Sequence, residues 1–247
     1  MDCEARTVAE LRGEYVREKT SALLVGGYVD AHFSGEMEQF RADNPEIFTK
    51  KGELRSEFQQ AEEIIRRLEG DPLAVRMLEG EKQQILTGEI YDYPFKAKLD
   101  VWLNAEQVQG IARDFPQMSE LMFALGAIVD LKIMKDFSPQ YRDGAGRLNF
   151  VEFWGYDLQL AIYQRLKVET AGINPPCYIL GATKQNAPGL GLFQIDQHEM
   201  DVQLLLLEKN LPRWADLKAG LIAPERCEKC EYCRKTKTLT GPELLEV

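Results

Sequence analysis

A carboxylate and an ammonium group stand two positions apart in the apolar segment 128–134, as Asp130 and Lys132. Side chains of a β-strand alternate between its two faces, so this segment as a strand carries both groups on one face. Burying two charged groups is costly unless each has a partner. The pattern therefore allows two interpretations: a satisfied structural ion pair, or a carboxylate that binds a divalent cation with a lysine beside it.

A second acidic residue has the same strand pattern in an earlier segment, where Lys96, Lys98 and Asp100 alternate with apolar residues. By itself, this segment is typical of a half-buried edge strand with a solvated face. Two carboxylates from neighbouring strands can bind Mg²⁺, which prefers oxygen ligands and retains several waters. Such a cation can activate water against a phosphate, and Lys132 can orient or deprotonate that water. Asp100 and Asp130 together therefore indicate a phosphodiester hydrolase.

Two helical segments contribute further polar candidates. Tyr156, Gln159 and Tyr163 have the spacing of one helical stripe, and a glutamine on an apolar stripe needs hydrogen-bond partners. A core helix with a satisfied amide is the alternative interpretation of Gln159. Asp30 lies within an apolar helical segment, where metal coordination would offset the cost of burying it. His32 is a competing ligand candidate nearby.

Hydrophobic periodicity predicts the elements that must position these groups. The expected helices cover residues 8–15, 20–33, 57–68, 150–169 and 198–207. The expected strands cover residues 83–90, 95–103, 127–134, 177–184 and 191–195. Pro116 interrupts an irregular helical segment at 105–125, Gly144 and Gly146 mark a loop, and Pro212 breaks or kinks the last helix. Helices followed by strands, a helix and more strands predict an α/β core with a helical N-terminal flank.

The four candidate pieces occur in a fixed order: Gly26 to Asp30, Asp100, Asp130 to Lys132, and Gln159 to Tyr163. They resemble the PD-(D/E)XK nuclease superfamily in its RecB-like branch, which has a Gly-x-x-x-His helix, a strand Asp, an Asp-x-Lys strand and a Gln-x-x-x-Tyr helix. More narrowly, the chain resembles the RecE-type exodeoxyribonuclease VIII group of phages and prophages over nearly its whole length. Asp30 departs from the pattern, since many relatives have His there, but Asp also binds hard metals.

The resemblance implies a restriction-endonuclease-like core, with a small mixed sheet flanked by helices, in a single nuclease domain over 1–247. Its segments are a helical flank (1–80), the catalytic sheet core with the glutamine helix (81–196), and a C-terminal helix with a Cys-rich tail (197–247). The implied catalytic residues are Asp100, Asp130, Lys132, Gln159 and Tyr163. The implied ligands of Mg²⁺ or Mn²⁺ are Asp30, Asp100, Asp130 and the backbone carbonyl of Leu131. The expected DNA contacts are Lys96, Lys98 and Lys135.

By the same resemblance, the substrate is linear double-stranded DNA, degraded from 5′ ends in phage-type recombination. The expected partner is a phage single-strand annealing protein, and a ring-like homo-oligomer is common in the group. Residues 104–125 look like an insertion without an assigned role. Two alternatives remain open: an inactive nuclease-fold module that only binds DNA, and a structure-specific endonuclease. Binding of DNA without turnover would indicate the inactive module. Cleavage of closed circles would indicate the endonuclease.

Three of the five cysteines, Cys227, Cys230 and Cys233, fall within seven residues. Closely spaced thiolates select zinc or iron–sulfur clusters, and a fourth ligand could be Cys3 or Cys177. Cas4-type and AddB-type nucleases resemble this chain in having one Cys before the first motif and three near the C-terminus. That likeness implies a [4Fe–4S] cluster on Cys3 and the three tail cysteines. Zinc, or a tail with empty thiols, is the alternative.

The composition is that of an ordinary globular protein, with 45% hydrophobic and 28% charged residues. No apolar run reaches the roughly 20 residues of a membrane span, and the charged N-terminus does not resemble a signal peptide. We therefore expect a cytoplasmic protein. The RecE-type resemblance implies a bacterial host and a gene encoded by a phage or prophage. A net charge of −10 limits any DNA contact to a local basic channel.

Overall fold

The computed structural model describes residues 3–239 and 241, which group into two compact units. The larger unit is Thr20–Leu207, and the smaller one combines Met1–Lys19 with Glu208–Val247. The single domain over 1–247 and its three segments stay predictions. Residues 1–2, 240 and 242–247, at the ends of the predicted first and last segments, lie outside the described residues.

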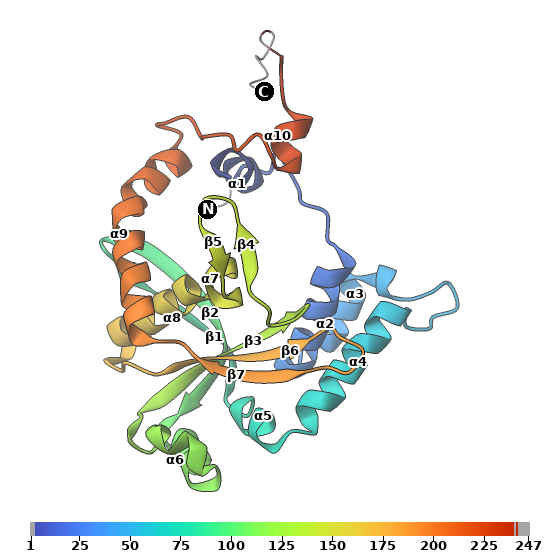
Figure 1. Ribbon diagram of the computed structural model, residues 1–247, viewed down its shortest axis with the longest axis vertical. Helices are drawn as coiled ribbons and strands as arrows, with labels where there is room; N and C mark the ends of the chain where they lie inside the picture. Colours follow the sequence, from blue (N-terminus) through green and yellow to red (C-terminus); the bar gives the residue numbers. More distant parts are fainter. Residues whose placement is uncertain (1–2, 240, 242–247) are drawn as a thin grey trace. The chain divides into compact units, whose positions relative to one another are not determined.

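The larger unit is built on a five-stranded sheet with the strand order β1-β2-β3-β6-β7 (Figure 1). Its strands are β1 (Glu81–Ile90), β2 (Tyr93–Asn104), β3 (Gly126–Met134), β6 (Cys177–Thr183) and β7 (Leu190–Gln194). β3 and β6 run parallel, whereas the other neighbours are antiparallel. The predicted α/β fold with a small mixed sheet is confirmed.

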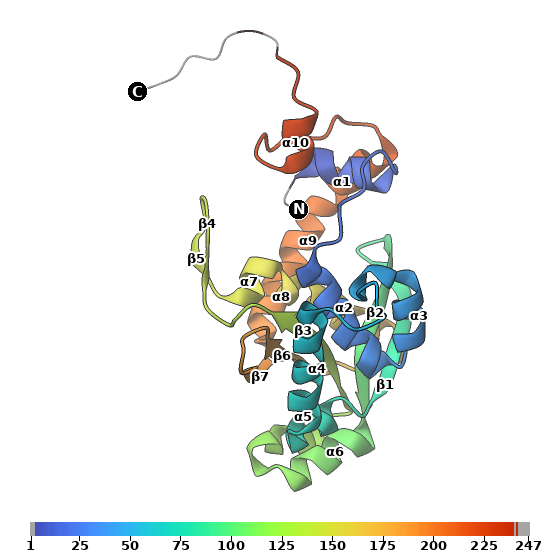
Figure 2. The same cartoon turned by 90° about the vertical axis from the view of Figure 1, so that its right-hand side faces the viewer.

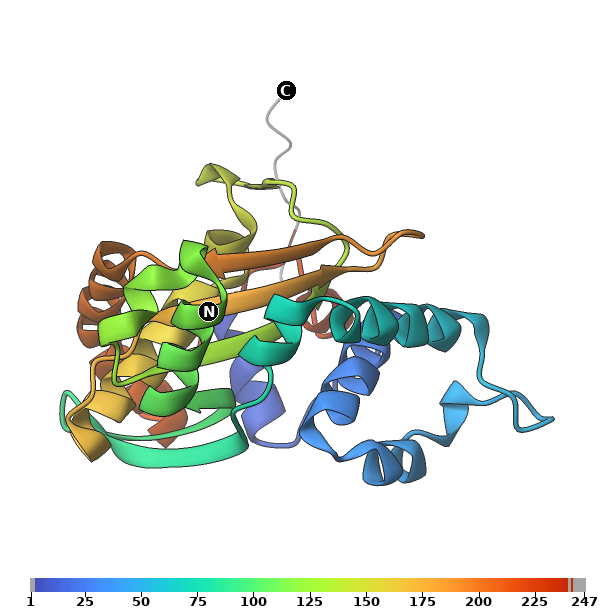
Figure 3. The same ribbon diagram turned by 90° about the horizontal axis from the view of Figure 1, so that it is seen from below.

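Helices precede the sheet, and the apolar spacing predicted those at residues 20–33 and 57–68. They are α2 (Ser21–Ser34), α3 (Met37–Asp43), the 3₁₀ turn η1 (Pro45–Ile47), α4 (Ser56–Glu69) and α5 (Pro72–Met77). The apolar stripe of α4, which includes Ile64 and Leu68, is buried in the core that the sheet shares with α2. α2 and α4 are in contact and lie side by side in Figure 3. This packing fixes α2, and with it Asp30, against the sheet.

Residues between β2 and β3 form α6 (Ala105–Asp114) and the 3₁₀ segment η2 (Pro116–Phe123), broken before Pro116 as expected. The side chain of Asn104 accepts a hydrogen bond from the Gln107 backbone, and the Gln107 side chain accepts one from Asn104. This reciprocal capping starts α6. Val108 and Ile111 are buried in the same core as the sheet. The segment 104–125 is therefore part of the packed unit.

The chain after β3 differs from its prediction in two ways. Where a loop was expected, β4 (Gln140–Arg142) and β5 (Gly146–Leu148) form a hairpin, which Figure 2 shows projecting from the sheet. Where one helix was expected, there are two, α7 (Phe150–Trp154) and α8 (Tyr156–Ala171). Gly155 separates them with φ 70, and this left-handed backbone cannot continue a right-handed helix.

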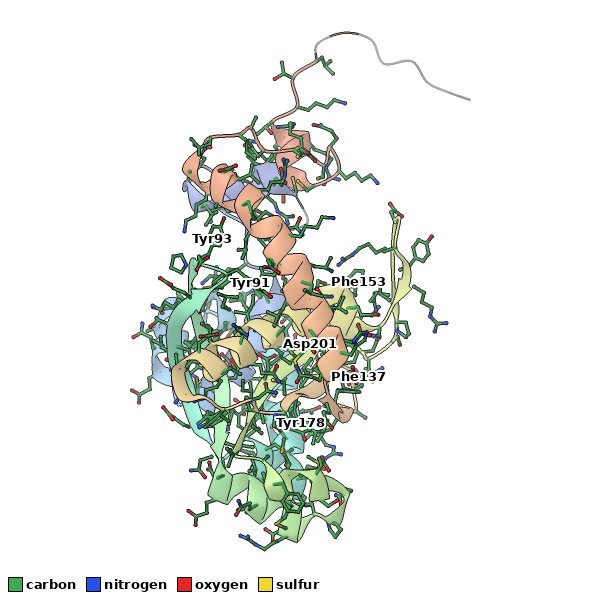
Figure 4. All side chains as sticks on the ribbon, turned by 90° about the vertical axis from the view of Figure 1, so that its left-hand side faces the viewer. Tyr91, Tyr93, Phe137, Phe153, Tyr178 and Asp201 are labelled. Atoms are coloured by element: carbon green, nitrogen blue, oxygen red, sulfur yellow. The ribbon has the colours of Figure 1, made fainter. Side chains whose placement is uncertain are left out.

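Three aromatic rings anchor the chain where it leaves β3. Phe137 lies 5.1 Å from Phe193 and 5.7 Å from Phe150 between ring centroids (Figure 4 labels Phe137). Glycines make room for this cluster. A Cβ at Gly181 would lie 2.6 Å from the Phe137 ring, and one at Gly191 would lie 2.4 Å from Phe193. The cluster ties the end of β3 to β6 and β7.

The last long helix, α9 (Gln197–Ala219), continues through Pro212, where a break or kink was expected. It begins in the larger unit and ends in the smaller one. The smaller unit also contains α1 (Glu4–Leu11) and α10 (Glu231–Lys235). Within this unit, Arg213 on α9 pairs with Glu4 on α1, at 2.7 Å between Nε and Oε1. None of the described helices has the length and apolar character needed to cross a bilayer.

We expect that Gly80→Ala, directly before β1, lowers the free energy of unfolding by about 1–3 kcal/mol. The added Cβ would lie 2.3 Å from the backbone oxygen of Trp102, and backbone yields less easily than a side chain. Urea denaturation followed by tryptophan fluorescence measures the change. Gly26→Ala is the control, because a Cβ there meets nothing within 4 Å and alanine favours the helix. Equal stability of both variants would contradict this expectation.

Candidate active site

The candidate site lies where two neighbouring strands separate. β2 and β3 pair only from Val101 to Asn104, opposite Gly126 to Val129. Beyond this stretch, β2 continues along β1 and β3 continues along β6. The same register places Asp100 and Asp130 at the first positions where the strands are no longer paired. The two carboxylates thus lie at the opening of a fork in the sheet.

The fork itself orients Asp100. Its Oδ2 accepts a hydrogen bond of 3.0 Å from the backbone N–H of Leu131, which has left the ladder with β2. A buried backbone donor without a partner would be costly, so the carboxylate satisfies a group that strand separation exposes. The Asp100 carboxylate also lies near enough to Asp130 to act on its charge. Two acidic groups are therefore held together in a partly buried space.

Asp130 is fully buried and ion-paired with Lys132, at 2.6 Å between Oδ2 and Nζ. Burial raises the pKa of Asp130 well above its usual range. Burial lowers the pKa of Lys132, but the Asp130 and Asp100 carboxylates outweigh it, and the net shift is upward. Among the described residues, Oδ2 of Asp130 has no hydrogen-bond partner besides this ion pair. A carboxylate oxygen so placed can accept a further partner, such as a cation.

The glutamine helix contacts this pair directly. Nε2 of Gln159 on α8 donates to Oδ1 of Asp130 at 3.3 Å and to the Tyr163 hydroxyl at 2.7 Å. Nζ of Lys132 lies 5.0 Å from the centre of the Tyr156 ring, a cation–π distance. The structure therefore brings Gln159 to Asp130, and it brings Tyr163 to Gln159. Tyr156 also lies at this site; the sequence placed it on the same helical stripe but did not predict it as a catalytic residue.

Asp30 approaches from α2. It shares a small cavity of about 10 Å³ with Lys82, Gln83, Asp100 and Leu131, among other residues. Burial, followed by the nearby Asp100 carboxylate, raises the pKa of Asp30 to about 6. A carboxylate whose proton affinity is raised by a second carboxylate in a confined space favours a cation between the two. Lys82 and Gln83 were not predicted from the sequence.

The acidic donor set fits a hard divalent cation, which binds through one or two carboxylates and retains water. Within residues 3–239 and 241, the only group of three or more Cys, His, Asp or Glu ligand atoms that all lie within 4.8 Å of one another is a cysteine cluster. Asp30 and Asp100 line one cavity and Asp100 lies near Asp130, but the three carboxylates do not form such a group. Binding of one ion by all three, and by the carbonyl of Leu131, stays a prediction.

The remaining candidates around the fork have different surroundings. His32 lies 2.8 Å from Glu69, between Nε2 and Oε1, so its ring has a partner outside the cavity. Lys96 and Lys98 are exposed on β2, as the strand alternation predicts, and Lys135 is exposed just after β3. DNA contact by these lysines stays a prediction.

The smaller unit contains the cysteine cluster, formed by Cys3, Cys227, Cys230 and Cys233. Sγ of Cys3 lies 3.6 Å from Sγ of Cys233, which lies 4.0 Å from Sγ of Cys227. Backbone N–H groups at Cys230 and Cys233 donate to Sγ of Cys227 and Cys230, as suits thiolates. Cys177 is buried in β6 of the other unit, and burial raises the pKa of its thiol. The structure thus gathers Cys3, and not Cys177, with the tail cysteines.

A mixed sheet that forks at Asp100 and Asp130, with an Asp-x-Lys strand and a glutamine helix across the fork, defines the class of PD-(D/E)XK nucleases. The chain belongs to the family described as a PDDEXK-like domain of unknown function (DUF3799), whose pattern matches residues 1–111 and 117–236. A crystal structure from Eubacterium rectale, provisionally described as that of an exonuclease, has a TM-score of 0.86 and 38% identity to this chain, covering 98% of this chain and 84% of the other. No protein with a curated description matches.

Proposed function

We propose that this protein is a divalent-metal-dependent exonuclease that hydrolyses phosphodiester bonds of linear double-stranded DNA. The observation that carries the proposal is the fork, which presents Asp100, Asp130 and Lys132 together where two interior strands of the sheet separate. The provisional description of the Eubacterium rectale protein supports the exonuclease part. Degradation from 5′ ends and a role in phage-type recombination belong to this proposal.

In this proposal, Asp100 and Asp130 hold Mg²⁺ or Mn²⁺, with Asp30 as a third candidate ligand. A cation held there would supply a water of lowered pKa and would neutralise charge on the phosphate. Lys132, held at Asp130, orients that water or stabilises the developing charge. Gln159 donates to Asp130 and to Tyr163, so it fixes the carboxylate from the opposite side. Tyr156 limits where the Lys132 ammonium can lie.

For the cysteine cluster, we propose a single zinc ion. Four thiolates at about 2.3 Å from one tetrahedral ion stand about 3.8 Å apart. The measured separations of 3.6 Å and 4.0 Å agree with this spacing, and all four sulfurs lie within 4.8 Å of one another. In a [4Fe–4S] cluster, each thiolate binds a different iron, which requires wider spacing. The cluster implied by the resemblance therefore fits the thiols less well than zinc.

We expect linear duplex DNA to be degraded in Mg²⁺ while the same duplex in closed circular form survives. An exonuclease needs a DNA end, because its site takes a strand terminus. The measurement is release of label from a duplex labelled at each 5′ end in turn, beside an intact circle, with and without EDTA. Early release of 5′ label supports 5′-to-3′ polarity. Late release of the 5′ label would indicate degradation in the opposite direction, from 3′ to 5′.

The two alternatives give different results in this experiment. A structure-specific endonuclease would also cut the circle. A module that only binds DNA would retard both forms without turnover in Mg²⁺ or Mn²⁺. The Asp at position 30, where many relatives have His, favours the module that only binds DNA, whereas the intact Asp130–Lys132 pair beside Gln159 favours turnover.

The proposal extends to partners through the RecE-type resemblance alone. A phage single-strand annealing protein would receive the 3′ overhang, and a ring-like homo-oligomer would enclose the duplex. Light scattering of the purified chain with and without a duplex measures the second of these. Lys96, Lys98 and Lys135 are the exposed cations that we propose for the DNA path.

A further inference from the structure

Gln83 has an unusual backbone for the interior of a strand. It lies within β1 with φ 55, in the left-handed region that a side chain with Cβ rarely adopts. The pairs Lys82↔Val101 and Gln84↔Leu99 on either side place Gln83 opposite Asp100. Such a conformation costs on the order of 1–3 kcal/mol and persists where the surroundings enforce it. The strained residue therefore faces the candidate catalytic carboxylate across the ladder.

The left-handed backbone changes where the neighbouring side chains lie. Consecutive side chains of a regular strand point to opposite faces. Here, Lys82 and Gln83 both line the small cavity that also contains Asp30 and Asp100. The departure from alternation thus brings two polar side chains, instead of one, to the carboxylates.

The amide oxygen of Gln83 is buried and, within the described part of the chain, has no hydrogen-bond partner. A buried acceptor without a donor costs about 1–3 kcal/mol. None of the other polar side chains of the cavity donates to this oxygen, and the Ser34 hydroxyl donates to the backbone oxygen of Ala31. Asp30 and Asp100 are acceptors when ionised, and Nζ of Lys82 donates to the backbone oxygen of Leu78. Strain and an orphaned oxygen coincide at one residue.

We infer that Gln83 is part of the metal site, with its amide oxygen binding the divalent cation or a water on that cation. An oxygen that faces carboxylates has a natural partner in a hard cation or its water, because both are attracted to several oxygens at once. The cavity of about 10 Å³ has room for roughly one water-sized species. The inference rests on the proposed function, since it adds a ligand to the same cation site.

The test measures Mn²⁺ binding to the full chain without DNA, by titration calorimetry and by the loss of the free Mn²⁺ electron paramagnetic resonance signal. Gln83→Gly is the decisive variant, because glycine adopts φ 55 without strain and removes only the side chain. We expect this variant to bind Mn²⁺ at least about tenfold more weakly than the wild type, as for the loss of other groups that support a metal site. We also expect unchanged or higher thermal stability.

Gln84→Ala is the matched control, since it removes the same side chain one position further on. Gln84 accepts from Nζ of Lys167 and does not line the cavity, so its variant should bind Mn²⁺ as the wild type does. Wild-type affinity in Gln83→Gly would overturn the inference and leave the proposed nuclease intact. A wild-type chain that binds no Mn²⁺ would overturn both the metal site and the inference.

Discussion

Asp130→Asn is expected to reduce DNA hydrolysis by at least about a thousandfold, because a cation held by this carboxylate supplies several kcal/mol of transition-state stabilisation. Asp130 is fully buried at the fork and contacts both Lys132 and Gln159. An amide keeps the shape and loses the charge that holds the metal. Lys132→Ala should also remove most of the activity, since it removes the ammonium beside the water. Initial rates of nucleotide release in Mg²⁺ measure both effects.

Asp157→Asn provides the matched control for this experiment. Asp157 is another buried aspartate of the same unit, but its Oδ2 accepts from Gln203 instead of facing the fork. Its variant should retain activity within a few-fold of the wild type. Thermal unfolding of each variant shows whether the fold is kept. Full activity in a folded Asp130→Asn protein would refute the assigned site.

The second large effect is expected at the cysteine cluster, where Cys233→Ser should remove the bound metal and unfold the smaller unit. A structural zinc site contributes most of the folding energy of a small domain. In this unit, the buried apolar cluster around the thiols contains Cys3, Ala5 and Cys233. Elemental analysis of the wild type should give one zinc per chain, and the variant none. Limited proteolysis should then cut the variant within α1 and the tail.

Cys177→Ala is the control, because this thiol is buried in β6 and lies in the other unit. It should retain the zinc. Anaerobic purification of the wild type distinguishes the remaining alternatives. Iron together with a visible absorption band would indicate a [4Fe–4S] cluster instead of zinc. A protein without either metal would mean that the thiols are empty.

Local patterns predicted most of the elements around the site. The alternation in β2 and β3 placed Asp100, Asp130 and Lys132 on strands, and the structure has both strands within two residues of the expected ends. The helical spacing of Gln159 and Tyr163 predicted a shared stripe, and their side chains are hydrogen-bonded. Such patterns succeed because side-chain direction repeats with period 2 in strands and 3.6 in helices.

Other elements depended on information that periodicity does not contain. The break between α7 and α8 comes from the left-handed conformation of Gly155, and a glycine is compatible with either a helix interior or its end. Each strand of the β4–β5 hairpin is only three residues long, which is too short to show alternation. α9 continues through Pro212, so the predicted break is absent, whereas the predicted kink stays a prediction.

The sequence by itself determined which residue types are available for catalysis: two strand carboxylates, a lysine two positions on, and a glutamine helix. Only the tertiary structure decided that β2 and β3 part at Asp100 and Asp130, that Cys3 and not Cys177 joins the tail cysteines, and that Gln83 faces Asp100. Strand pairing, and the contact of Cys3 with the tail cysteines, join residues that are far apart in the chain. Their positions are therefore set by packing of the whole unit, which no local pattern contains.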